Sequence, residues 1–159
     1  MNAVEVVLDG LAASPIAEWV RQSRWGYAGI ATAHVLGIAL LVGAILPMDL
    51  RLLGAGRAID IPGLARLLLP VAVTGLLLAI GSGLLMFSGR ATEYAGYGLF
   101  QIKIALVLTG AASALLIHCR FGPWLQGMPR KIQIRTAILS LCSWLGALIC
   151  GRSIAFLYG

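Results

Sequence analysis

The chain has 159 residues, of which 60% are hydrophobic and 11% are charged, and its formal net charge is +6. This length suits a single domain. So few charged residues cannot cover the surface of a soluble domain, and the mean hydropathy of +0.94 indicates a protein of the lipid bilayer. The basic excess does not indicate a nucleic-acid-binding protein, because the basic residues sit mainly in short loops between apolar runs and no RNA- or DNA-binding motif is present.

Residues 1–25 are expected to form an amphipathic segment that lies at the membrane interface. Within it, SPIAEWVRQS has the signature of a helix start, with Ser14 as N-cap, Pro15 at the first helical position and Glu18 in the first turn. The start of the chain is acidic rather than basic, which argues against a secretory signal peptide. The first membrane helix is therefore expected to direct the chain to the membrane.

Residues 26–159 are expected to form an all-α domain, an integral-membrane antiparallel four-helix bundle. Four apolar runs are long enough to cross a hydrocarbon core of about 30 Å. The segments between them are rich in glycine or proline, as turns require. We place the transmembrane spans at residues 27–47, 67–87, 99–118 and 137–157.

The basic residues outside the spans predict the orientation of the bundle. One side carries seven of them, in the first and third connecting segments: Arg51, Arg57, Arg66, Arg120, Arg130, Lys131 and Arg135. The other side carries three: Arg21, Arg24 and Arg90. Because basic residues concentrate on the cytoplasmic side, both termini are predicted to be periplasmic in a bacterial inner membrane.

Three basic side chains fall inside the predicted spans at a similar depth. Counted at 1.5 Å per helical residue, His34 lies about 10 Å, Lys103 about 6 Å and Arg152 about 8 Å from the same edge. Ionisable residues inside a membrane are costly and mark functional sites by default. We therefore expect these side chains, from three different helices, to form one site.

The chemistry of this predicted site favours haem. A neutral imidazole is a good ligand for haem iron, so His34 is the expected metal ligand. Arg152 could pair with the propionates, and Lys103 could ligate the iron or pair with an anion. Gly37 and Gly81 could leave a slot for a porphyrin face, although close helix packing is the default role of small residues. A closed copper site is disfavoured, since no cluster of His, Met and Cys lies at this depth.

The same residues also have purely structural interpretations. A histidine in a membrane helix can simply bond a neighbouring helix, and Lys103 and Arg152 can extend toward the headgroups. Near the opposite edge, Asp49 and Arg51 are expected to form a local ion pair or helix stop, with coupling to a partner or proton as the alternative. His118 is expected to be a boundary residue that meets water. It lies about 20 Å from His34, too far to share one haem.

Two stretches, HVLGIALLVGAILPMDLRLLG and GRSIAFLYG, resemble a family of uncharacterised bacterial four-helix membrane proteins. An early-helix histidine followed by LFQIKIALVLTG is similar to the four-helix membrane protoporphyrinogen oxidases of bacteria. That family binds haem b and relies on a first-helix histidine and a lysine at the start of the third helix, and His34 and Lys103 fall on these positions. The third span also resembles the copper-resistance D membrane domain, whose matching helix carries a similar lysine. The resemblance implies bound haem b.

The sequence thus predicts a small b-type haem-binding membrane protein that takes part in electron transfer or in redox chemistry of porphyrins or quinones. Its expected partners are the lipid bilayer and either quinone or a membrane redox protein. Its classification as an oxidoreductase, its oligomeric state and the sixth iron ligand are left open. Two other functions stay open. One is a transporter or channel module for a metal ion or small anion, lined by His34, Lys103 and Arg152, and the other is a cofactor-free assembly subunit.

Overall fold

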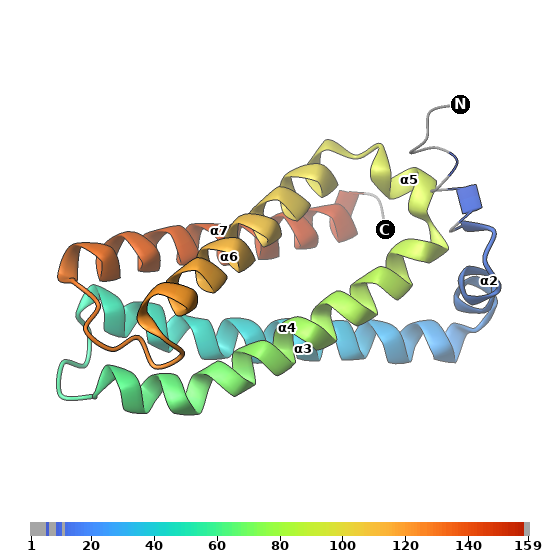
Figure 1. Ribbon diagram of the computed structural model, residues 1–159. Coiled ribbons are helices and arrows are strands. Elements are labelled where there is room, and N and C mark those ends of the chain that lie inside the picture. The colour runs from blue at the N-terminus through green and yellow to red at the C-terminus, as the bar shows by residue number, and fades with distance from the viewer. Residues whose placement is uncertain (1–5, 7–8, 11, 158–159) are drawn as a thin grey trace.

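The structure is a computed structural model that describes residues 6, 9–10 and 12–157. Over these residues the fold is all-α, as predicted (Figure 1). The elements in chain order are α2 (Pro15–Gln22), α3 (Arg24–Leu53), α4 (Ile61–Gly89), α5 (Ala91–Ala95), α6 (Gly98–Phe121) and α7 (Arg130–Leu157).

Helix α2 begins where the sequence predicts. The Ser14 hydroxyl accepts a hydrogen bond from the amide nitrogen of Ala17 at 3.2 Å, and Pro15 is the first helical residue. Ala17 and Val20 are buried where α2 packs against α4 and α3, whereas Trp19 is exposed. Residues 1–5, 7–8 and 11 of the predicted interfacial segment lie outside the described residues.

Helices α3, α4, α6 and α7 are each long and apolar enough to cross a membrane. They extend beyond the predicted spans, because a helix keeps its backbone hydrogen bonds after it leaves the hydrocarbon core. Helix α3 continues through Pro47 to Leu53 and ends at Gly54, whose φ of 114° is the left-handed conformation that terminates many helices. Helix α7 likewise begins at Arg130, ahead of its predicted span.

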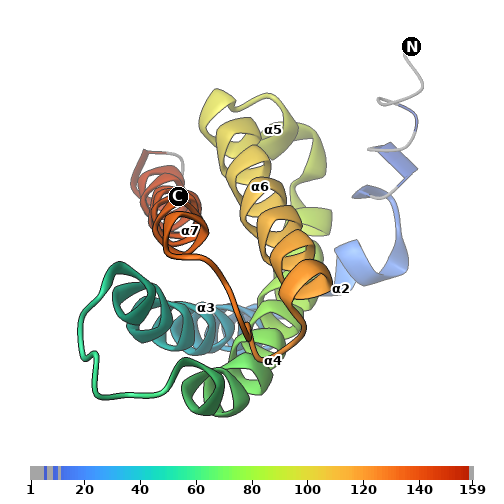
Figure 2. The ribbon, with the colours of Figure 1, turned by 60° about the vertical axis from the view of Figure 1, so that its left-hand side comes forward.

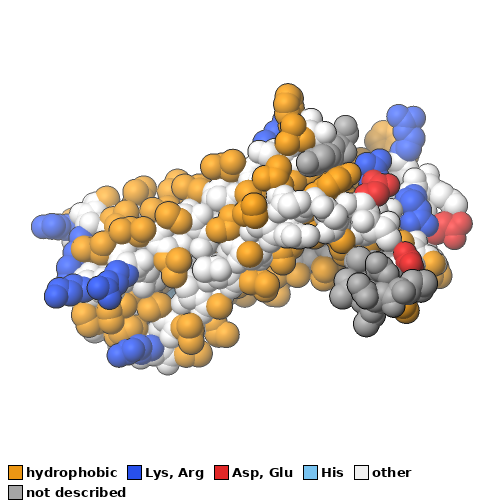
Figure 3. Space-filling view, turned by 90° about the horizontal axis from the view of Figure 1, so that it is seen from above, with side chains coloured by type: hydrophobic (Ala, Val, Ile, Leu, Met, Phe, Trp, Pro, Cys, Tyr) orange, Lys and Arg blue, Asp and Glu red, His pale blue; other side chains and the backbone are white. Residues whose placement is uncertain are grey.

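Large apolar side chains point outward along the middle of all four long helices. Their exposed fractions include 66% for Val35, 66% for Leu77, 63% for Leu108 and 64% for Ile149. Figure 3 shows hydrophobic side chains along the flank of the molecule and basic side chains at its ends. A surface of this kind requires lipid rather than water around it. The chain is a multi-pass membrane protein with four candidate spans, and its orientation stays a prediction.

The four long helices form two antiparallel pairs, α3 with α4 and α6 with α7, and the pairs meet through α3 and α7. The pairs lie one above the other in Figures 1 and 2. Within the described chain, no Cα atom of α4 lies within 8 Å of a Cα atom of α6. The backbones of α4 and α6 are therefore separated by a gap, which side chains can occupy.

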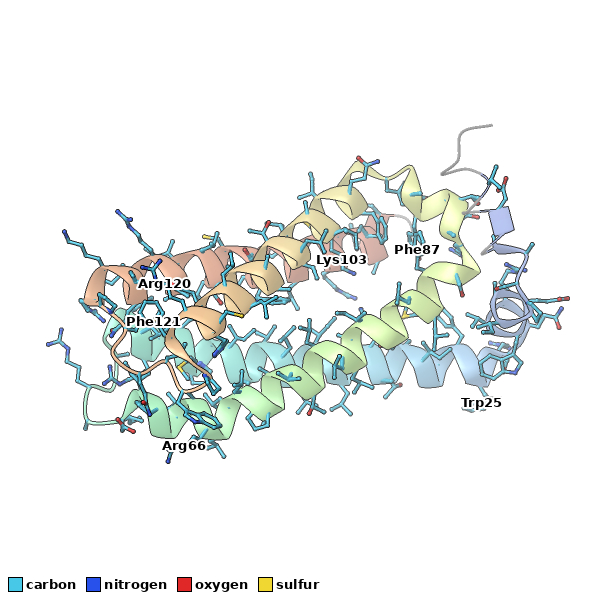
Figure 4. The ribbon with its side chains drawn as sticks, viewed as in Figure 1. Trp25, Arg66, Phe87, Lys103, Arg120 and Phe121 are labelled. Atoms are coloured by element: carbon cyan, nitrogen blue, oxygen red, sulfur yellow. The ribbon has the colours of Figure 1, made fainter. Side chains whose placement is uncertain are left out.

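Side chains bridge this opening at its two ends. Near α5, the ring of Phe87 on α4 stacks on that of Phe100 on α6, with centroids 5.1 Å apart. At the other end, the guanidinium of Arg66 on α4 lies 5.6 Å from the ring centroid of Trp124, in the α6–α7 loop. Phe87 and Arg66 are labelled in Figure 4.

Helices α3 and α4 make their closest contact at two glycines. A Cβ atom added to Gly37 would lie 2.6 Å from the backbone nitrogen of Ala79, and one added to Gly75 would lie 2.8 Å from the carbonyl oxygen of Gly37. The two backbones therefore meet with no room for a side chain, as small residues permit in membrane bundles. His34 lies one turn before Gly37, so this contact turns its side chain toward α4.

Both hairpin loops lie at the same end of the bundle (Figure 1). There Leu125 and Met128 of the α6–α7 loop pack with Leu52 and Ala137 in a buried cluster. The guanidinium of Arg130 donates hydrogen bonds to the last carbonyl groups of α3, those of Leu52 and Leu53. The α6–α7 loop thus packs across this end of the bundle and covers it.

Candidate functional site

The imidazole of His34 is held by α4. Its Nδ1 atom lies 2.9 Å from the carbonyl oxygen of Ala79 and 3.2 Å from the hydroxyl oxygen of Ser82. The Ser82 hydroxyl donates in turn to the carbonyl of Leu78. Because a carbonyl oxygen only accepts, we assign the ring proton to Nδ1, which leaves a lone pair on Nε2.

The glycines around His34 have different roles. A Cβ atom on Gly83 would lie 3.0 Å from Cε1 of His34, so the absence of a side chain there makes room for the ring. At Gly37, which we expected to border a porphyrin slot, the space is filled by the backbone of α4. Gly81 is exposed, and no atom lies within 4 Å of its Cβ position. No slot lies beside Gly37.

The Nε2 atom of His34 is free to bind a ligand. It makes no hydrogen bond to the described residues, yet it is not one of the enclosed polar atoms of this part of the chain. An imidazole nitrogen with a lone pair, a fixed ring plane and an open approach has the properties of an iron ligand.

Lys103 on α6 is the second member of this site. Its ammonium is near enough to His34 for the two groups to interact electrostatically. The side chain is half-buried beside Gly151, whose Cβ position lies 3.5 Å from Nζ, and it points from α6 into the space between the two helix pairs (Figure 4). Among the described residues it has no hydrogen-bond or ion-pair partner. A cation buried in this way is available to an anionic or oxygen-bearing ligand.

Arg152 differs from the other two predicted site residues. It is exposed, and it lines a separate surface hollow near the end of α7 with Ser153, Phe156 and Leu157. Its exposure suits a side chain that extends toward headgroups. The structure thus brings two of the three predicted residues, His34 and Lys103, toward one space.

Asp49 does not form the predicted ion pair with Arg51. The Arg51 guanidinium donates to the carbonyl oxygens of Ile59 at 2.6 Å and Arg57 at 3.4 Å, both in the α3–α4 loop. Helix α3 continues to Leu53, so Asp49 and Arg51 both lie on it. Residues two apart on a helix face directions about 200° different. Asp49 therefore points away from Arg51 and is only 3% exposed. Its side chain forms a hydrogen bond with Ser140 on α7, while its Oδ2 atom is buried without a hydrogen-bond partner among the described residues.

The prediction that His118 meets water is also wrong for one of its ring nitrogens. Helix α6 continues to Phe121 and the following loop folds under the bundle, so Nδ1 of His118 is buried without a partner in the described chain. His118 and Asp49 line the same cavity, about 380 Å³ in volume, between the four long helices.

The polar groups therefore lie at two levels. Helices α3 and α6 run in the same direction (Figure 1), and 15 residues, or about 22 Å, separate His34 from Asp49 and Lys103 from His118. Between the levels, the indole of Trp144 packs on Gly110, where a Cβ atom would lie 2.9 Å from Cε2 of the indole.

Sequence reasoning did not identify the partners of His34. A backbone carbonyl such as that of Ala79 has no sequence signature. Ser82 appears in the sequence only as a serine between two glycines, a pattern that does not indicate a partner for a histidine. Comparison with known proteins adds no partner either. No family model matches the chain, and no curated protein or solved structure matches it. The chain has four long apolar helices, and no family is identified.

Proposed function

We propose that this chain is a small b-type haem-binding membrane protein that takes part in electron transfer, with His34 as axial ligand. The observation that carries the proposal is the 2.9 Å hydrogen bond between Nδ1 of His34 and the carbonyl oxygen of Ala79. Histidines that ligate metals almost always donate their other ring N–H to a carbonyl or carboxylate, which fixes the tautomer and the ring plane. When bound, haem b supplies a one-electron redox centre.

The residues present fit the group on the side of His34 where Nε2 lies. Gly37 and Gly83 are filled by α4 and by the imidazole itself, so we place the flat ring on the Nε2 side. Lys103 points into the space between the helix pairs (Figure 4). It can pair with a propionate or serve as a second ligand, and it has no ion-pair partner among the described residues, which supports either role.

One alternative is a cofactor-free assembly subunit. In that case the bond from His34 to α4 serves only helix packing, and the purified protein is colourless and metal-free. The transporter or channel alternative predicts a colourless protein with a bound metal ion or anion.

A visible spectrum of the purified full-length chain separates these functions. The haem protein shows a Soret band and binds about one haem per chain. The band is lost in His34→Ala and kept in His118→Ala, a matched control because both histidines lie in apolar helices at different levels. A colourless protein that fails to take up added haem would contradict the proposal, as would an equal Soret band in His34→Ala.

A further inference from the structure

The cavity below Trp144 is a second candidate site, and it lies apart from His34. All four long helices contribute to its walls, which are mostly apolar, with Leu41, Ala44, Leu69, Ala72 and Leu76 among the lining residues. Leu52 and Leu125 line it at the loop end, where they belong to the buried cluster. Its volume of about 380 Å³ lies within the range of small-molecule sites.

Two residues that line this cavity each carry a buried polar atom with no hydrogen-bond partner among the described residues. One is Oδ2 of Asp49, a residue only 3% exposed, and the other is Nδ1 of the half-buried His118. The Asp49 side chain also forms one hydrogen bond, with Ser140 on α7, which leaves Oδ2 unpaired. Buried polar atoms are nearly always paired in folded proteins, since an unpaired one destabilises the fold. Two such atoms, on residues that line one apolar cavity, therefore indicate a ligand that pairs with both.

The positions of the two groups restrict the shape of this ligand. Asp49 lies on α3 and His118 on α6, and no Cα atom of α3 lies within 8 Å of one of α6 in the described chain. The two side chains therefore reach into the cavity from different walls. A ligand that bonds both needs hydrogen-bonding atoms at its two ends and a body that fits apolar walls.

The access route restricts its origin. Helices α4 and α6 both line the cavity, and their backbones do not approach each other. Val73 on α4 and Leu115 on α6 line the cavity and are also exposed, so we expect both to contact the hydrocarbon core. A ligand with an apolar tail can thus enter sideways from the bilayer and leave its tail between these helices.

We propose that this cavity binds the ring of a membrane quinone. A para-hydroquinone carries hydroxyl groups at opposite ends of a flat apolar ring. One hydroxyl donates to Oδ2 of Asp49 and the other to Nδ1 of His118. An acyl chain would leave both atoms unpaired, and an organic cation would leave His118 unpaired, so the quinone class satisfies the site best. The proposal does not depend on haem at His34.

Binding can be measured on the full-length chain in phosphatidylcholine nanodiscs with reduced decylubiquinone as the probe. The His34→Ala variant serves as background, so that haem does not interfere and failure of either proposal can be told apart. Trp144 lines the cavity, so its fluorescence should fall on binding. Replacement of Asp49 or His118 by leucine should weaken binding about tenfold, the effect of losing one hydrogen bond to a charged or buried group.

A cavity-filling variant guards against misfolding of those two. Ala114→Phe leaves both polar groups in place, fills the cavity and should abolish binding. Ser88→Ala is the control, because Ser88 is buried outside the cavity and bonds only the carbonyl of Leu85. Three results would overturn the proposal: equal affinity in all these variants, equal quenching by decanol, or binding of tetraphenylphosphonium in preference to the quinol.

Discussion

His34 and Ala79 join the first two membrane helices through a hydrogen bond of 2.9 Å between the imidazole Nδ1 and a backbone carbonyl oxygen. This bond explains how a polar ring is tolerated among apolar side chains, since a buried N–H costs little once it is paired. The bond also decides that Nε2 is the ring nitrogen that remains available as a ligand. Haem binding at His34 requires Nε2 to face the space between the helix pairs.

The space for the His34 ring is provided by Gly83, and a side chain there should displace it. In Gly83→Val the new Cβ atom would lie 3.0 Å from Cε1 of the imidazole, so the ring must move and haem affinity should fall about tenfold or more. Gly81→Ala is the matched control, because the Cβ position there has no neighbour within 4 Å. Haem titration followed by Soret absorbance measures both. Equal losses in the two variants would argue against the packing described for His34.

Lys103 should raise the reduction potential of the haem. A nearby ammonium disfavours the ferric state, which carries one more positive charge than the ferrous state. Lys103→Gln should therefore lower the midpoint potential by about 40 mV or more, equivalent to about 1 kcal/mol of charge interaction. Lys103→Arg keeps the charge and should keep the potential. A potentiometric titration that finds no difference between the natural chain and Lys103→Gln would remove Lys103 from the site.

The contact between α3 and α4 should not tolerate a side chain at Gly75. A Cβ atom there would lie 2.8 Å from the carbonyl oxygen of Gly37, and Gly75→Val should cost about 1–3 kcal/mol, the usual range for overpacking. Gly43→Ala is the control, because its Cβ position is open and alanine favours a helix by up to about 1 kcal/mol. Thermal unfolding in detergent should thus move in opposite directions. A stable Gly75→Val would mean that the helices do not meet here.

The two aspartates of the first hairpin should respond oppositely to substitution. Asp49→Leu removes a buried carboxyl oxygen that is unpaired among the described residues, together with the hydrogen bond to Ser140, and fills the same volume. Because an unpaired buried carboxyl oxygen costs more than one hydrogen bond contributes, the melting temperature should rise. Asp60 caps α4, with its Oδ2 atom 2.8 Å from the amide nitrogen of Gly63. Asp60→Ala should therefore lose about 1 kcal/mol. A lower melting temperature of Asp49→Leu than of the natural chain would show that the hydrogen bond between Asp49 and Ser140 outweighs the cost of the unpaired oxygen.

The sequence predicted the features that depend on neighbouring residues. Four apolar runs of sufficient length and the Ser14–Pro15 helix start are local signals, and both are found. The sequence analysis placed Asp49 and His118 at the edges of the spans, because an ionisable residue after an apolar run is taken as the end of the span. In the structure both helices continue past these residues, and each of the two side chains has a buried polar atom.

The tertiary partners of the site residues could not be predicted in the same way. Counting along a helix predicts similar depths for His34 and Lys103, and their grouping in one site stays a prediction. Counting could not tell which way each side chain points around its helix. Depth alone therefore could not predict that Arg152 is exposed or that Gly37 packs against α4 where a slot was expected.

Chemical rescue of His34 tests the central claim most directly. In His34→Gly the imidazole is removed while the carbonyl of Ala79 and the hydroxyl of Ser82 remain. In a haem titration, this variant should lack the Soret band that the natural chain shows. Added free imidazole should restore both the band and a stoichiometry of about one haem per chain. Haem binding by His34→Gly without imidazole, with the spectrum of the natural chain, would show that another residue holds the iron.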